Sequence, residues 1–218
     1  LGNDGESCEV EIRSERWMAT ARNIVASRGP RSGRLTVAAH IDTKPGTPGA
    51  VDNAAGVAAV AMLAGLLSPT RHPSHDVGLD LLVVNGDDHY AAPGEVACLS
   101  DNELTLDDVA LFINIDGAGY RVGRTAYSTY NVPAAVHSRI EAALEGRDDL
   151  IQGPDWDQSD HAIFALQGRP ALAFTTEHVD EMLESLFHAP TDTPDKVDAA
   201  LVVGIAGALE ELVLGWST

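Results

Sequence analysis

The chain alternates short apolar runs with longer Ala- and Leu-rich segments, and this alternation limits its possible folds most strongly. Apolar runs bounded by polar residues are typical of buried strands, whereas long Ala- and Leu-rich segments without a breaker are typical of helices. Such an order predicts a mostly parallel sheet with helices on both faces. The predicted strands are 8–12, 19–27, 34–42, 77–86, 109–116 and 169–176, and the predicted helices are 54–67, 132–146, 159–168 and 198–216.

The size and composition of the chain predict one globular domain. It has 218 residues, of which 44% are hydrophobic, and this is enough for a sizeable core. No repeat or linker divides it, so residues 1–218 are expected to form a single three-layer α/β domain with a mixed, mostly parallel sheet. The sequence begins with Leu instead of Met. The compartment therefore stays open, and no feature of the sequence indicates an oligomeric state.

The charge of the chain excludes some partners. A formal net charge of −19 argues against nucleic acid, which needs a basic face, and against anionic membrane surfaces. No apolar run approaches the roughly 18 residues that a membrane span needs. Cys8 and Cys98 are the two cysteines, and without a Cys-x-x-Cys pair they indicate no thiolate metal site, while one disulfide stays open.

Polar residues follow three of the predicted strands. His40 and Asp42 end the first of these strands, Asp87 and Asp88 follow the second, and Asp116 ends the third. In α/β sheets, ligands bind beyond the carboxyl ends of parallel strands. We therefore expect the chemistry of this chain to lie at that edge of the sheet.

Each of these side chains alone has a structural explanation. An isolated Asp is usually a turn or cap residue, and Asp52 fits the N-cap of the predicted helix 54–67. Several carboxylates at one sheet edge repel one another unless a cation compensates them. Carboxylates together with imidazole suit zinc or another divalent first-row metal. These carboxylates and the histidine together therefore favour a metal site more strongly than any one of them does alone.

Six segments of the chain carry a family resemblance. They resemble, in order and approximate spacing, the zinc aminopeptidase family, metallopeptidase family twenty-eight, with its aminopeptidase S and aminopeptidase Y types and, more distantly, glutaminyl cyclases. The resemblance covers about 35–198 and implies the zinc-exopeptidase fold, which often has further helices upstream of the position of Leu1. The segments are "AAHIDT", "GAVDNAAGV", "NGDDHYAAPGE", "INIDG", "SDHAIFALQGRPALAF" and "FHAPTDTPDKVD".

The resemblance implies five ligands for two zinc ions. By it, His40 and Asp116 hold one zinc ion, Asp88 and His188 hold the other, and Asp52 bridges the two. Other divalent first-row metals are compatible with the same residues.

The resemblance also implies a set of supporting features. Asp42 is expected to fix the tautomer of the imidazole two residues before it. A cis peptide is expected at Asp52–Asn53, with Gly49 and Gly56 leaving room for that backbone.

The general base of the family is the first acid of a Glu-Glu pair, and here the pair is Asp87-Asp88. Asp87 is therefore expected to take the proton of the attacking water, although its side chain is one methylene shorter. A second departure is Phe187, where several relatives carry Tyr.

The expected activity is hydrolysis of N-terminal residues from a peptide or aminoacyl substrate, with a water shared by the two metals as nucleophile. Two alternatives stay open. One is a mononuclear enzyme of the glutaminyl cyclase or amidohydrolase kind, and the other is an inactive binding domain on the same fold.

Two further segments are candidates for shaping the substrate pocket. Asp155, Trp156 and Asp157 either contact substrate or form an ordinary acidic loop. Asp160 and His161 are expected mainly to begin a helix beside the pocket, with Ser159 or Asp160 as its cap.

Overall fold

The computed structural model describes residues 10–13, 15, 18, 20–73, 76–89, 93–100, 105–156 and 158–216. The strands are β1 Ile24–Arg28, β2 Arg34–His40, β3 Leu79–Val84, β4 Val109–Ile115, β5 Thr125–Tyr130, β6 Leu150–Gln152 and β7 Ala171–Thr176. The helices are α1 Ala55–Leu66, α2 Pro93–Ser100, α3 Ala134–Leu144, α4 His161–Leu166, α5 Val179–Ser185 and α6 Ala199–Leu214, and the short helical turns are η1 Ala50–Ala54 and η2 Pro194–Lys196.

The strands of this described part of the chain form one seven-stranded sheet in the order β1-β3-β2-β4-β7-β5-β6. Strand β2 pairs in parallel with β3 and β4, and β4 pairs in parallel with β7. The antiparallel pairs are β1 with β3 and β5 with β7, whereas β6 is parallel to β5. The prediction of a mixed, mostly parallel sheet is confirmed.

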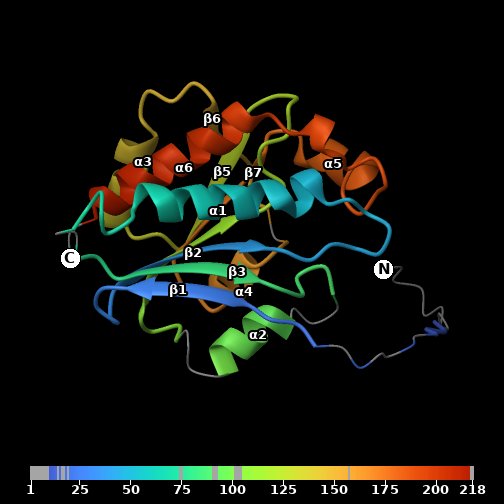
Figure 1. Cartoon of the computed structure of the whole chain (residues 1–218), viewed down its shortest axis with the longest axis horizontal. Helices are drawn as coiled ribbons and strands as arrows, with labels where there is room; N and C mark the ends of the chain where they lie inside the picture. The colour runs from blue at the N-terminus through green and yellow to red at the C-terminus, as the bar shows by residue number, and fades with distance from the viewer. Residues whose placement is uncertain are drawn as a thin grey trace, which may run out of the picture.

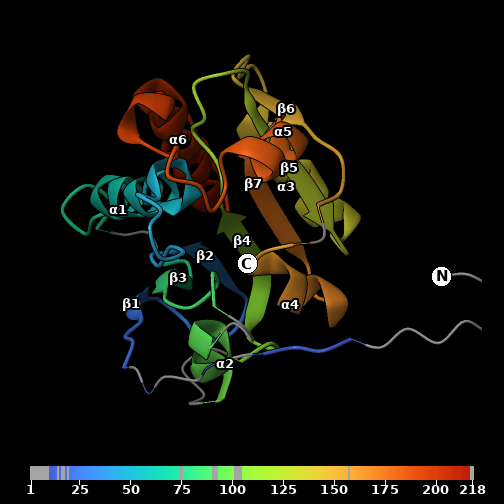
Figure 2. The ribbon, with the colours of Figure 1, turned by 90° about the vertical axis from the view of Figure 1, so that its right-hand side faces the viewer.

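Helices cover both faces of the sheet, as Figures 1 and 2 show. Helices α1, α3 and α6 share one hydrophobic core with the upper face of the strands in Figure 1. Helices α2 and α4 cover the other face, where Phe112 of β4 stacks on Phe164 of α4 with ring centroids 3.9 Å apart. Among the described residues, no helix is both long enough and apolar enough to cross a bilayer.

A buried ion pair lies at the amino ends of β2 and β3, opposite to their carboxyl ends. Asp80 accepts hydrogen bonds from Nε and Nη2 of Arg34 at 2.6 and 2.7 Å, and each side chain is 7% exposed. Ser27 donates a further hydrogen bond to Asp80 from β1. Because this fork is bidentate and buried, it fixes three neighbouring strands at that end.

Several predicted elements differ from the observed ones. Residues 10–12 of the predicted strand 8–12 are not in a strand, and the predicted strand 19–27 is reduced to β1. Elements β5, β6, α2 and α5 were not predicted, because their sequences are short or rich in polar residues. Cys8 lies outside the described residues and Cys98 is buried in α2, so the question whether the two cysteines pair stays open.

Candidate metal centre

The strand-end residues meet because their strands are parallel neighbours. His40 is the last residue of β2, which lies between β3 and β4. Asp116 directly follows β4, and Asp87 and Asp88 lie on the turn after β3. The carboxyl ends of adjacent parallel strands lie at one edge of a sheet, so these four side chains meet there.

Asp52 reaches this edge from the turn before α1. The N-cap of α1 is Ala54, so Asp52 does not cap the helix, and its buried carboxylate turns toward His40. The Asp52–Asn53 peptide is cis, as expected from the resemblance.

Two glycines leave room for this backbone, also as expected. A Cβ at Gly49 would lie 2.9 Å from the backbone oxygen of Asp52, and one at Gly56 would lie 2.3 Å from Oδ1 of Asn53.

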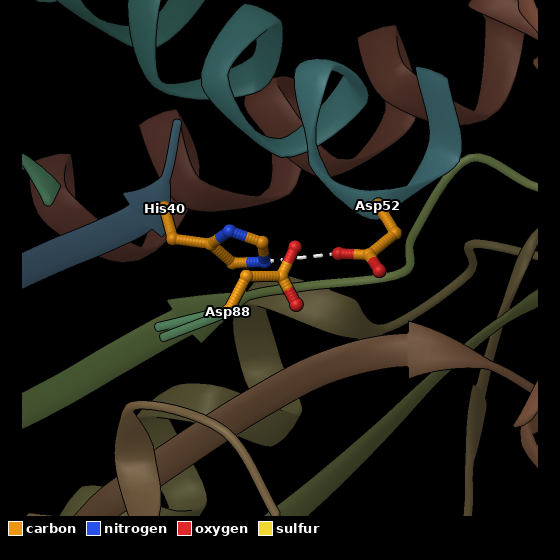
Figure 3. A group of neighbouring side chains, drawn as sticks. All are labelled: His40, Asp52 and Asp88. Atoms are coloured by element: carbon orange, nitrogen blue, oxygen red, sulfur yellow. Dashed lines mark ion pairs between the residues drawn. The ribbon is translucent and has the colours of Figure 1, made fainter. Parts of the chain in front are cut away.

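Figure 3 shows the side chains of His40, Asp52 and Asp88, which face one another at this edge of the sheet. Oδ1 of Asp52 lies 3.0 Å from Nε2 of His40, and Oδ2 of Asp52 lies 3.6 Å from Nε2 of His188. His40 Nε2 is also 3.3 Å from Oδ1 of Asp116, and His188 Nε2 is 2.6 Å from Oδ1 of Asp88. The five predicted ligands therefore form two histidine–aspartate pairs with Asp52 between them.

Asp42 contacts His40 differently from the expectation, in which its carboxylate fixes the tautomer of the imidazole. Nδ1 of His40 lies 3.0 Å from the backbone oxygen of Asp42, whereas the carboxylate is 3.8 Å away. That carboxylate instead accepts hydrogen bonds from the backbone N–H groups of Gly86 and Asp88, and it lies 3.0 Å from Nδ1 of His89. Asp42 thus orients the imidazole through its backbone and holds the turn after β3 through its side chain.

Asp192 supports the turn that carries Asp52, and the sequence reasoning missed it. Its side chain is fully buried and accepts hydrogen bonds from the backbone N–H groups of Val51 at 2.8 Å and Asp52 at 3.1 Å. Burial raises the pKa of Asp192, although these N–H groups favour its ionised form. Asp192 lies within the quoted segment "FHAPTDTPDKVD". No sequence spacing indicated that it would support η1.

The charges of the site are unbalanced. Asp52, Asp87, Asp88 and Asp116 line one cavity, to which Lys44 brings one positive charge. The Lys44 ammonium donates to the backbone oxygen of Asp88, and it is 3.8 Å from Oδ1 of the same residue. Oδ2 of Asp88 is buried, and no group of the described residues donates a hydrogen bond to it. Such an excess of buried negative charge is the setting in which proteins hold cations.

The pKa values of the site reflect the same crowding. Burial lowers the pKa of the His40 imidazole, but the attraction of Asp116 and Asp52 outweighs this and raises it well above its usual range. Burial, assisted by the negative charge of Asp116, raises the pKa of Asp87 to about 6. Nitrogen and oxygen donors in this number fit a divalent metal such as zinc.

The cavity at this edge has a volume of about 200 Å³, and apolar groups form part of its lining. Trp156, Leu183 and Phe187 line it together with the acidic residues. Asp155 instead lines a separate cavity, and Asp157 lies outside the described residues. Trp156 is thus the member of the predicted acidic loop that faces the site.

The segment before α4 shapes this wall. His161 is fully buried, and its Nε2 lies 2.7 Å from the backbone oxygen of Trp156, which fixes the loop. Asp160 occupies the N-cap position of α4, but its carboxyl makes no capping hydrogen bond. The expectation that Ser159 or Asp160 caps this helix is confirmed for the position of Asp160, although the helix gains no hydrogen bond from its carboxyl group.

A comparison with protein families gives this geometry its context. The model of peptidase family M28 matches residues 23–213. The chain belongs to peptidase family M28. The resemblance seen in the six sequence segments is thereby confirmed.

Individual relatives of this M28 chain are distant. It is 27% identical to "Probable lipoprotein aminopeptidase LpqL" of Mycobacterium tuberculosis over 235 aligned residues, which cover 91% of this chain and 46% of that protein. Its structure matches a zinc aminopeptidase from Bacillus subtilis with a TM-score of 0.69 and 20% identity, over 88% of this chain and 49% of the other. The chain therefore spans about half the length of these two aminopeptidases.

A third similar structure has a different named activity. It is a glutaminyl cyclase from Bacteroides thetaiotaomicron bound to N-acetylhistamine, matched with a TM-score of 0.72 and 16% identity over 89% of this chain and 77% of the other. At such low identity, the structural matches establish a shared fold, and the function must be argued from the site.

Proposed function

We propose that this chain is the catalytic domain of a two-zinc aminopeptidase, which releases N-terminal residues from peptides. The observation that carries the proposal is the placement of Asp52. One of its oxygens faces His40 and the other faces His188, as expected of a carboxylate that bridges two ions. The aminopeptidase names of the M. tuberculosis and B. subtilis relatives support this reading, and the second of these names includes zinc.

The two ions would be held by the pairs described above. His40 and Asp116 would hold one, Asp88 and His188 would hold the other, and Asp52 would contact both. Asp42 would support them through its hydrogen bonds to the turn that carries Asp88. Ions bound there would supply a water of lowered pKa and a Lewis acid for the scissile carbonyl.

Asp87 is the group that would move the proton. Its side chain is 19% exposed and lines the cavity, and its Oδ2 lies 3.8 Å from Nε2 of His40. In the ionised form, its carboxylate can accept the proton of the attacking water and then donate it to the nitrogen of the leaving amine. Phe187 lines the same cavity without a hydroxyl, so its side chain offers apolar contact and no hydrogen bond to an oxyanion.

The shape of the cavity supports cleavage at a chain end. A volume of about 200 Å³ is small, and the acidic groups that line the cavity can attract the ammonium of a peptide N-terminus. Trp156, Leu183 and Phe187 offer an apolar wall to the side chain of the terminal residue.

The test is hydrolysis by the zinc-reconstituted chain of a panel of aminoacyl-p-nitroanilides, with the N-acetylated forms of the same compounds as controls. The proposal predicts chelator-sensitive release from the free-amine compounds and none from the acetylated ones. Equal release from both would indicate an amidase without N-terminal selectivity, and cyclisation of an N-terminal glutamine without anilide release would indicate a cyclase. Absence of every activity in a zinc-loaded chain would favour a binding domain.

A further inference from the structure

Two buried acidic side chains lie next to Asp87 and are not among the proposed metal ligands. Glu95 lies in the first turn of α2 and is 4% exposed, and Asp160 lies at the start of α4 and is 1% exposed. Both helices cover the same face of the sheet (Figure 2), so the two residues lie on one side of it. Carboxyl oxygens of Asp87, Glu95 and Asp160 lie within 4.8 Å of one another.

The four oxygens of Glu95 and Asp160 are buried, and no N–H or O–H group of the described residues is placed to donate a hydrogen bond to them. Three ionised carboxylates this close, without a donor, would repel one another strongly in a poorly solvated site. Closely spaced carboxyl groups avoid this by sharing a proton. Burial raises the pKa of Asp160 well above its usual range, and Glu95 and Asp87 raise it further.

We propose that Glu95 is a positioning residue for Asp87, acting through the protonated carboxyl group of Asp160. The neighbouring carboxyl group of Glu95 keeps the proton on Asp160, and the O–H of Asp160 donates a hydrogen bond to the carboxylate of Asp87. A hydrogen bond between a carboxyl and a carboxylate is charge-assisted and directional. It therefore fixes the orientation in which Asp87 faces the cavity. This inference rests on the proposed function, since it gives a role to the group that supports the base.

Kinetics of the zinc-reconstituted chain test the proposal with three variants. Glu95→Leu removes the polar group at similar volume, Glu95→Gln keeps a hydrogen-bonding group, and Glu141→Gln is the control at an exposed position on α3. We expect Glu95→Leu to lower kcat about tenfold with little change in KM or zinc content, because one orienting hydrogen bond is lost. Glu95→Gln should recover most of the loss, and the control should match the wild type.

Other kinetic results would overturn the proposal. If Glu95→Leu changed the melting temperature but not kcat per folded chain, Glu95 would be structural only. If Glu95→Gln lost a metal ion that the wild type retains, the cluster would be a cation site instead.

An infrared measurement on the zinc-loaded chain tests for the proton on Asp160 without relying on hydrolysis. We expect a protonated-carboxyl stretching band at neutral pH, which shifts in Glu95→Gln and is lost in Asp160→Asn. Absence of that band in the wild type would refute the inference even if the chain were an active aminopeptidase. A wild type that shows the band but hydrolyses no substrate would refute the proposed function and leave the protonated Asp160 established.

Discussion

Replacement of Asp192 tests whether its carboxylate positions Asp52 by holding the backbone before α1. Asp192 is not among the residues that line the cavity, and its carboxylate is joined to the site through the backbone N–H groups of Val51 and Asp52. Asp192→Asn keeps the size of the side chain but replaces one accepting oxygen with an NH₂ donor. That donor then faces a backbone N–H in a fully buried position.

The cost follows from the hydrogen bonds that are lost. A hydrogen bond to a charged group contributes about 1.5–3 kcal/mol, and a buried donor left without a partner costs about 1–3 kcal/mol. We expect Asp192→Asn to lower the free energy of unfolding by about 2–3 kcal/mol, and Asp192→Ala by about 3–5 kcal/mol. Removal of such a support typically weakens metal binding by about 10–100-fold.

The assays are denaturant unfolding and competition with a chelating dye for zinc. Asp195→Asn is the matched control, because Asp195 lies on η2 in the same segment with its side chain 68% exposed. The control should behave as the wild type in both assays. If Asp192→Asn left both zinc affinity and stability unchanged, the idea that Asp192 positions Asp52 would be refuted.

The remaining predictions concern the base, the ligands and the ion pair. Asp87→Asn should reduce kcat by about 100-fold or more while zinc stays bound, and turnover near the wild-type level would remove Asp87 as the base. Because burial raises the pKa of Asp87 to about 6, kcat should fall as the pH drops through that value, or through a lower one when cations are bound beside it. An acidic limb above about pH 7 would contradict this assignment. His40→Ala and Asp116→Ala should each leave about one zinc ion per chain by atomic absorption, and full zinc content in both would exclude them as ligands. Asp80→Ala removes the carboxylate that pairs with the buried guanidinium of Arg34, and it should lower the free energy of unfolding by about 3–5 kcal/mol. A change below about 1 kcal/mol would show that the Arg34–Asp80 ion pair contributes little to stability.

One physical reason explains why the sequence predicted both the sheet and the proximity of the residues at the strand ends. Buried parallel strands are short continuous apolar runs, so their carboxyl ends can be located, and polar residues there must share an edge. His40, Asp88 and Asp116 were found in this way. His188 lies on the loop after α5, where no apolar run marks its place, so only the family resemblance identified it.

The supporting residues could not be predicted because their contacts depend on tertiary structure. Asp192 accepts from backbone N–H groups about 140 positions earlier in the chain. Glu95 lies in α2, whose sequence gives no sign that a carboxyl group is buried there. The preference of Asp42 for backbone donors also follows from the turn after β3 and not from spacing. Apolar patterning is therefore a good guide to the sheet and a poor one to the side chains that support the site.

The most direct test of the central claim is the zinc content of the reconstituted chain, measured for the wild type and for Asp52→Ala. Because the two oxygens of Asp52 face one histidine each, its loss should weaken both positions at once. Two zinc ions per chain in the wild type, with fewer than one in the variant, is the predicted result. One zinc ion or none in the wild type, or an unchanged pair in Asp52→Ala, would contradict the two-zinc centre.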